Sequence, residues 1–163
     1  MRRRGRGAKV LPGISQMEDD MSNANIKIVQ DCYAAFGRGD VPAILAVLTD
    51  DVSFGMVGRP EDVPMAGIHQ GKAGAAEFFR CLKETQEITR FSPSDFAAND
   101  SNVYVGGSVA WIMNRNGVAG ENDWVHVFTF RDGKICAFRG HEDTGLLAAA
   151  YHADPEPRRA ASR

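Results

Sequence analysis

Apolar residues recur at three- and four-residue steps in three segments of the first half of the chain, and this spacing predicts amphipathic helices. The first helix is expected from residue 23 to residue 36, with Ser22 or Asn23 as its N-cap. The second is expected over 41–49, after Asp40 as a cap, and the third over 71–85. The apolar face of the first helix contains Ile26, Val29, Cys32, Tyr33 and Phe36.

Alternating apolar and polar positions in the second half of the chain predict strands over 88–97, 102–114, 123–130 and 134–142, after a short strand over 52–56. Turn-forming pairs such as Asn99-Asp100 separate these strands, so neighbours in sequence should pair in an antiparallel way. Gly106-Gly107 predicts a bulge. Residues 57–71 have no period and predict a long loop, which forms either a pocket rim or plain surface.

Helices first and strands last indicate an α+β domain, with helices on one face of a curved antiparallel sheet. A last short helix is expected over 144–152, capped by Asp143. We place the domain at residues 23–152. Residues 1–22, rich in Gly and Arg and then acidic, and residues 153–163 have no hydrophobic period and are expected to be disordered tails.

Charge and composition narrow the classes of partner. The chain has 19 Lys and Arg residues against 21 Asp and Glu residues, and many of the basic ones lie in the tails, so the body is acidic. Nucleic acid is therefore not expected to bind the folded body, because neutralising phosphates needs a basic surface. No apolar run predicts a signal peptide or a membrane span.

The cysteine and glycine patterns give no indication of a bound metal or nucleotide. The three cysteines, Cys32, Cys81 and Cys136, are widely spaced among apolar neighbours, which indicates reduced thiols and a cytoplasmic location. No Cys/His cluster predicts a metal site, and no Gly-rich phosphate loop predicts a nucleotide cofactor. We therefore expect neither a metal nor a cofactor.

The order of elements, with YAAFGRGDVPAILAVLTDDVSF early and WVHVFTFRDGKICAFRGHEDTGLLAAA late, resembles the nuclear transport factor 2 superfamily, and more closely its SnoaL-like and ketosteroid-isomerase-like branch. The resemblance covers about residues 23–152. It implies a cone-shaped fold, with N-terminal helices packed on a strongly curved antiparallel sheet, and a homodimer. It also implies a small apolar or cyclic ligand.

Members of this branch include cofactor-independent acid/base enzymes, such as cyclases, isomerases, dehydratases and hydrolases, and domains that only bind a ligand or dimerise. In the steroid isomerases a tyrosine, a general-base aspartate and a protonated aspartate carry the reaction; the corresponding positions here are Cys32, Met56 and His126. Methionine cannot abstract a proton and a thiol is a weak hydrogen-bond donor. The resemblance therefore does not extend to authentic steroid isomerisation.

An aspartate before the terminal helix is the acid/base group of the SnoaL-like cyclases, and Asp143 matches it by position. The same residue is also expected to cap that helix, and these two roles are left open.

The turn at Asp132-Gly133 decides which side chains face His126. A two-residue turn pairs Arg131 with Lys134 and turns the cationic Arg139 and His141 toward the pocket. A turn with a Gly133 bulge instead pairs Phe130 with Lys134, and we favour it because it puts Phe138 and Cys136 inside with Phe128.

With the bulged turn, His126 is the leading candidate for chemistry, because apolar neighbours should keep its imidazole neutral. Glu142 would share its face and could orient or charge it. A buried histidine with one ordinary hydrogen bond is the structural alternative. The candidate catalytic residues are thus His126, Asp143 and Glu142. The candidate pocket-lining residues are Tyr33, Phe54, Met56, Tyr104, Trp111, Trp124, Phe128 and Phe138.

Overall fold

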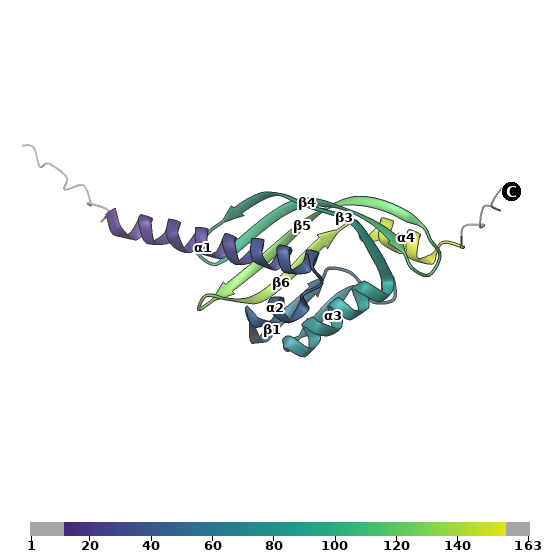
Figure 1. Ribbon diagram of the computed structural model, residues 1–163, viewed down its shortest axis with the longest axis horizontal. Coiled ribbons are helices and arrows are strands. Elements are labelled where there is room, and N and C mark those ends of the chain that lie inside the picture. The colour runs from purple at the N-terminus through teal and green to yellow at the C-terminus, as the bar shows by residue number, and fades with distance from the viewer. Residues whose placement is uncertain (1–11, 156–163) are drawn as a thin grey trace, which may run out of the picture.

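A computed structural model of the chain describes residues 12–155 (Figure 1). Its elements follow the predicted order, with one additional strand that was not predicted. They are α1 (Pro12–Gly37), α2 (Val41–Ala46), β1 (Leu48–Met56), β2 (Gly67–Gln70), α3 (Gly71–Thr85), β3 (Gln86–Ala98), β4 (Asn102–Met113), β5 (Ala119–Arg131), β6 (Lys134–Glu142) and α4 (Thr144–His152). Within residues 12–155, no helix is long and apolar enough to cross a membrane.

The strands form one six-stranded sheet in the order β2-β1-β6-β5-β4-β3. Strands β3 to β6 form the predicted antiparallel meander. Strand β1 runs parallel to β6, so the sheet is mixed, and the prediction of a wholly antiparallel sheet is wrong at this pair. Hydrophobic alternation reports which face of a strand is buried and not the direction of its neighbour, so the pattern could not show this pairing.

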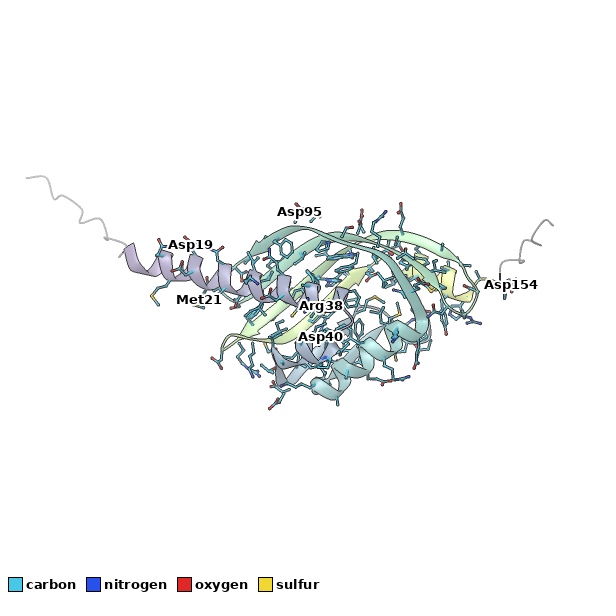
Figure 2. All side chains as sticks on the ribbon, viewed as in Figure 1. Asp19, Met21, Arg38, Asp40, Asp95 and Asp154 are labelled. Carbon is cyan, nitrogen blue, oxygen red and sulfur yellow. The ribbon has the colours of Figure 1, made fainter. Side chains whose placement is uncertain are left out.

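Helix boundaries agree with the pattern where an apolar face or a cap defines them. Helices α3 and α4 have the predicted ends, and Asp40 and Asp143 cap α2 and α4. Helix α1 instead begins at Pro12, so residues 12–22 are helical and their predicted disorder is wrong. Figure 2 shows that the part of α1 with Asp19 and Met21 extends past the sheet. The disorder predicted for residues 1–11 and 156–163 lies outside the described residues.

Several further boundaries differ from the predicted ones; strand β5, for example, begins at Ala119 instead of residue 123. Strand β1 begins at Leu48, which shortens the second helix, and β2 forms inside the segment that was predicted to be a loop. In Figure 1, helices α1, α2 and α3 lie together on one side of the sheet. Helix α4 lies at the opposite end of the molecule from the N-terminal part of α1. Helix α1 contacts β3 and β4, and α3 contacts β1, so one sheet face and three helices enclose the core.

The β5–β6 hairpin combines features of both predicted registers. Asp132 and Gly133 have φ angles of 51° and 75°, and Arg131 pairs with Lys134, so the turn has two residues and the favoured Gly133 bulge is wrong. The bulge occurs further along, because Thr129 pairs with Ala137 and Phe130 with Ile135, which leaves Cys136 as an extra residue.

The bulge at Cys136 places the side chains of β6 beyond it on the sheet faces that were predicted for them. Beyond it Phe128 pairs with Phe138, His126 with Gly140, and Trp124 with Glu142. Phe138 and Glu142 therefore share the inner face with His126, as predicted, while Arg139 and His141 lie on the outer face. Cys136 was expected inside with Phe128 and is instead the bulged residue.

A second irregularity lies at Gly106-Gly107, as predicted. Pro93 pairs with Gly107 and Asp95 with Gly106, so the extra residue is Ser94 on β3. A Cβ atom at Gly107 would overlap the Trp124 ring and lie 2.7 Å from the Ser92 carbonyl oxygen. Gly107 thus makes room for the indole of Trp124 against the sheet.

Replacing Gly107 with alanine should lower the free energy of unfolding by about 1–3 kcal/mol, because the new methyl group meets backbone and a packed ring. The matched control is Gly106→Ala, whose Cβ would lie 3.8 Å from the nearest atom, the Asp95 Cβ. Urea unfolding of both variants tests this, and equal stabilities would contradict the close fit of Trp124 on Gly107.

Candidate functional site

A cavity of about 90 Å³ lies between the helices and the inner face of the sheet. Its lining is mostly aromatic and aliphatic, and its polar members include Tyr33, Gln86, His126 and Glu142. Seven predicted site residues meet there from α1, β1, β5 and β6. They are Tyr33, Phe54, Met56, His126, Phe128, Phe138 and Glu142.

Tyr33 and His126 form a hydrogen-bonded pair that lines the cavity. The Tyr33 hydroxyl lies 3.0 Å from His126 Nδ1, and His126 is 8% exposed. Burial, with a smaller contribution from His141, lowers the pKa of His126 to about 3. Burial also raises the pKa of Tyr33 well above its ordinary value, with Cys32 contributing less. Both side chains are therefore uncharged at neutral pH.

Aromatic stacking holds the imidazole of His126 in place. The Trp124 ring stacks on it, with ring centroids 4.0 Å apart and planes inclined by 22°. Phe91 also stacks on Trp124, with centroids 5.0 Å apart and planes inclined by 7°, and its ring centroid lies 6.2 Å from that of His126. Strand alternation placed Trp124 and His126 on one face, but Phe91 comes from β3, where bulges break the alternation.

Glu142 brings a carboxyl group to the same cavity. Burial raises its pKa, and a hydrogen bond from Asn122 partly opposes this shift. Asn122 Nδ2 donates to Glu142 Oε2 at 3.2 Å, and Asn122 Oδ1 accepts from Trp111 Nε1 at 2.8 Å. Asn122 thus positions Glu142 and was not singled out in the sequence, because a lone asparagine in a strand has no distinguishing pattern.

The other predicted site residues do not line this cavity. Asp143 is exposed and caps α4, where its side chain accepts a hydrogen bond from the Leu146 N–H at 2.9 Å. Tyr104 is 39% exposed and lies on the outer face of the sheet. Trp111 and Trp124 are buried but are not among the residues that line the cavity.

Thirteen of the lining residues were not predicted, and two of them, Gly140 and Gln86, bear on the polar groups of the cavity. Gly140 lies opposite His126, and a Cβ there would be 3.7 Å from His126 Nε2, so Gly140 leaves space beside that nitrogen. Gln86 is buried where α3 passes into β3, a position that carries no periodic signal. Among residues 12–155, no cluster of three or more His, Cys, Asp or Glu side chains could hold a metal ion.

The low pKa of His126 predicts a pH dependence of stability. The unfolded chain binds a proton at this site below about pH 6.5 and the folded chain only below about pH 3, so stability should fall as the pH falls between these values. From pH 7 to pH 5 the contribution of His126 is a loss of about 2 kcal/mol.

Urea unfolding of the wild type and of His126→Gln at both pH values measures this contribution. The wild type should lose about 2 kcal/mol more than the variant. The opposite effect of Glu142, whose pKa is raised, cancels in this comparison because both proteins contain it. Equal losses in the two proteins would show that His126 is not held in its neutral form.

Comparison with known proteins agrees with this architecture. The model of the SnoaL-like domain matches residues 29–138. No curated protein matches the chain. An NTF2-like protein from Burkholderia xenovorans is similar, with 34% identity, a TM-score of 0.72, and 80% of this chain and 97% of that one covered.

Two other structures are similar at lower identity. An NTF2-like protein from Burkholderia pseudomallei has 26% identity and a TM-score of 0.74, over 80% of this chain and 98% of that one. TerC, co-crystallised with polyporic acid, has 26% identity and a TM-score of 0.72, over 80% of this chain and 99% of that one. The chain belongs to the SnoaL-like domain family of the NTF2-like superfamily.

Proposed function

We propose that this domain binds a small apolar or cyclic molecule in its cavity and carries out cofactor-independent acid/base chemistry on it, as a cyclase, isomerase, dehydratase or hydrolase does. The observation that carries this proposal is the Tyr33–His126 hydrogen bond, which presents a neutral polar pair to an otherwise largely apolar cavity. The cone shape and strong curvature that the family implies belong to the same proposal, and the bulges in β3 support them.

In this proposal His126 polarises the ligand and does not abstract its proton. Tyr33 keeps its proton because burial raises its pKa, so its O–H donates to Nδ1 and leaves the proton of the imidazole on Nε2. That N–H is beside the space at Gly140 and can donate to a carbonyl oxygen of the ligand. A neutral imidazole is a suitable electrophile, whereas a histidine with a pKa of about 3 is a weak base.

Glu142 is the proton carrier in this scheme. Its raised pKa brings the carboxyl group closer to neutral pH, where proton transfer in both directions is effective. The strand pairs Trp124–Glu142 and His126–Gly140 place Glu142 diagonally from His126, roughly 7–8 Å away between backbones. A carbonyl oxygen at His126 would therefore direct its α-carbon toward Glu142. Asp143 matched an acid/base position of the family, but its side chain caps α4. We therefore assign the acid/base role to its neighbour Glu142.

The size of the cavity sets a condition on the ligand. An apolar cavity of roughly 150 Å³ holds benzene, and this one measures about 90 Å³. A ring-containing ligand must therefore displace lining side chains. Phe36, Phe79 and Leu82 line the cavity and are only partly buried, so they can move outward at the smallest cost in packing. Polyporic acid in the similar structure of TerC supports binding of a cyclic molecule in this fold.

Ligand binding without catalysis is the second candidate function. It is favoured by the low pKa of His126 and by the absence of the steroid isomerase residues at Cys32 and Met56. The two functions differ in whether a bound ligand exchanges protons or is released unchanged.

The experiment that separates them uses 4-phenylcyclohexanone in D₂O, with α-proton exchange followed by NMR and binding followed by tryptophan fluorescence. The wild type should bind the ketone and accelerate exchange. Glu142→Gln should slow exchange by about 10²–10⁴-fold and still bind, because only the proton carrier is lost. His126→Leu should slow it by about 10²–10³-fold, because the carbonyl loses its hydrogen-bond donor.

Two glycine variants provide the controls. Gly140→Ala should weaken ketone binding at least tenfold, because its methyl group occupies the space beside His126 Nε2, whereas Gly106→Ala, which is outside the cavity, should bind as the wild type does. Binding without accelerated exchange would leave only the binding function. Absence of binding would contradict both.

The homodimer and the cytoplasmic location are also proposals. Val125 is 48% exposed and Tyr104 is 39% exposed on the outer face of β4 and β5, and this apolar surface supports pairing of two sheets. Cys32, Cys81 and Cys136 are free thiols, which supports a reducing compartment.

Val125→Lys tests the dimer by light scattering after size-exclusion chromatography. The wild type should have the mass of a dimer, and the variant the mass of a monomer, because two lysines would face each other across the sheets. Ile68→Lys is the control, since Ile68 is 43% exposed on the edge strand β2. A monomeric wild type, or a variant that stays dimeric, would contradict pairing through this face.

A further inference from the structure

We propose that the carboxamide of Gln86 is a second polar subsite of the cavity, which binds an uncharged hydroxyl group at the end of the ligand remote from His126. The inference rests on the proposed function, because it describes the ligand that the same cavity binds. It makes Gln86 a residue that determines specificity rather than one that reacts.

The side chain of Gln86 is buried and incompletely paired. Gln86 is 4% exposed and lines the cavity, and its Oε1 atom has no hydrogen-bond partner among the described residues. An unpaired buried polar group costs about 1–3 kcal/mol. A leucine or methionine of similar size would avoid that cost, so the amide is expensive unless it binds something in the cavity.

The backbone holds Gln86 firmly in this position. Its N–H donates to the Leu82 carbonyl as the cap of α3, and the residue pairs with Met113 on β4. The next pair along is also fixed, because the Asn114 N–H donates to the Thr85 carbonyl at 3.0 Å. The Asn114 side chain caps α3 as well, with 3.0 Å bonds to the Lys83 and Glu84 carbonyls. The backbone of Gln86 is thus fixed, so only the side-chain torsions of the amide remain to be ordered when a ligand binds.

The charge of the lining selects a neutral ligand group. Among residues 12–155, no Lys or Arg side chain lines the cavity, so a carboxylate or phosphate bound beside Gln86 would be a buried charge without a counter-ion from these residues. The carboxamide offers one acceptor and an N–H donor, and a hydroxyl group can use either. Leu82 and Ile88, which line the cavity and are close to Gln86 in the chain, suit an apolar ring.

The strand register separates the two polar subsites. His126 pairs with Val105 on β4, whereas Gln86 pairs with Met113 further along the same strand. Glu142 lies between them, because its partner Trp124 pairs with Gly107. A ligand that reaches both ends is therefore elongated, with an oxygen at each end and the reacting carbon beside the His126 end.

A pair of ketones that differ by one hydroxyl group tests this subsite. The probes are 4-phenylcyclohexanone and 4-(4-hydroxyphenyl)cyclohexanone, whose affinities are measured by calorimetry. The wild type should bind the hydroxylated ketone about 5–10-fold more tightly, the gain from one hydrogen bond of roughly 1–1.5 kcal/mol. Gln86→Met should remove this preference and bind the plain ketone at least as well as the wild type. The control is Gln30→Met, an exposed glutamine on α1, which should keep the preference.

The outcomes separate this inference from the proposed function. If the wild type binds both ketones equally, or Gln86→Met keeps the preference, the Gln86 subsite is wrong while the binding function stands. If neither ketone binds the wild type, both are wrong. A wild type without the preference overturns the Gln86 subsite even if the variant does not fold.

Discussion

The extra residue at Cys136 is the constraint on which the site depends. A two-residue turn at Asp132-Gly133 would, without correction, turn Arg139 and His141 toward the cavity. One bulged residue reverses this for the rest of β6, so that Phe138, Gly140 and Glu142 face the helices and the two basic side chains face outward. Without the bulge, the cavity would be cationic and Glu142 would lie on the outer face.

Burial shifts the pKa values of the polar groups in the cavity in opposite directions. The same low dielectric lowers the pKa of His126 and raises those of Glu142 and Tyr33, because it disfavours the charged form of each. Burial therefore favours the uncharged form of all three groups, and Tyr33 and His126 are uncharged at neutral pH. This condition suits a neutral carbonyl ligand better than an anion, and it gives the proton-carrying role to Glu142, whose pKa moves toward neutral pH.

Much of the fold could be predicted from the pattern, since α3, β6 and α4 each have an apolar period bounded by a glycine, a turn or a cap. The facing of Phe138 and Glu142 was also predicted, although through the wrong turn. The direction of β1 and the position of the hairpin bulge could not be, because both are set by packing between segments far apart in the chain. The roles of Gln86 and Asn122 could not be predicted for the same reason, because they depend on contacts with the cavity and with Glu142.

Gln86 and Trp124 show how differently an unpartnered polar atom can be interpreted. Trp124 Nε1 and Gln86 Oε1 are both buried without a partner among the described residues. The indole of Trp124 has a packing role, because it fits over Gly107 and stacks with both Phe91 and His126, and these contacts offset one lost hydrogen bond. The amide of Gln86 has no aromatic surface to offset its cost, and it lines the cavity whereas Trp124 does not. Ligand recognition is therefore the better explanation at Gln86, and support of His126 is the better explanation at Trp124.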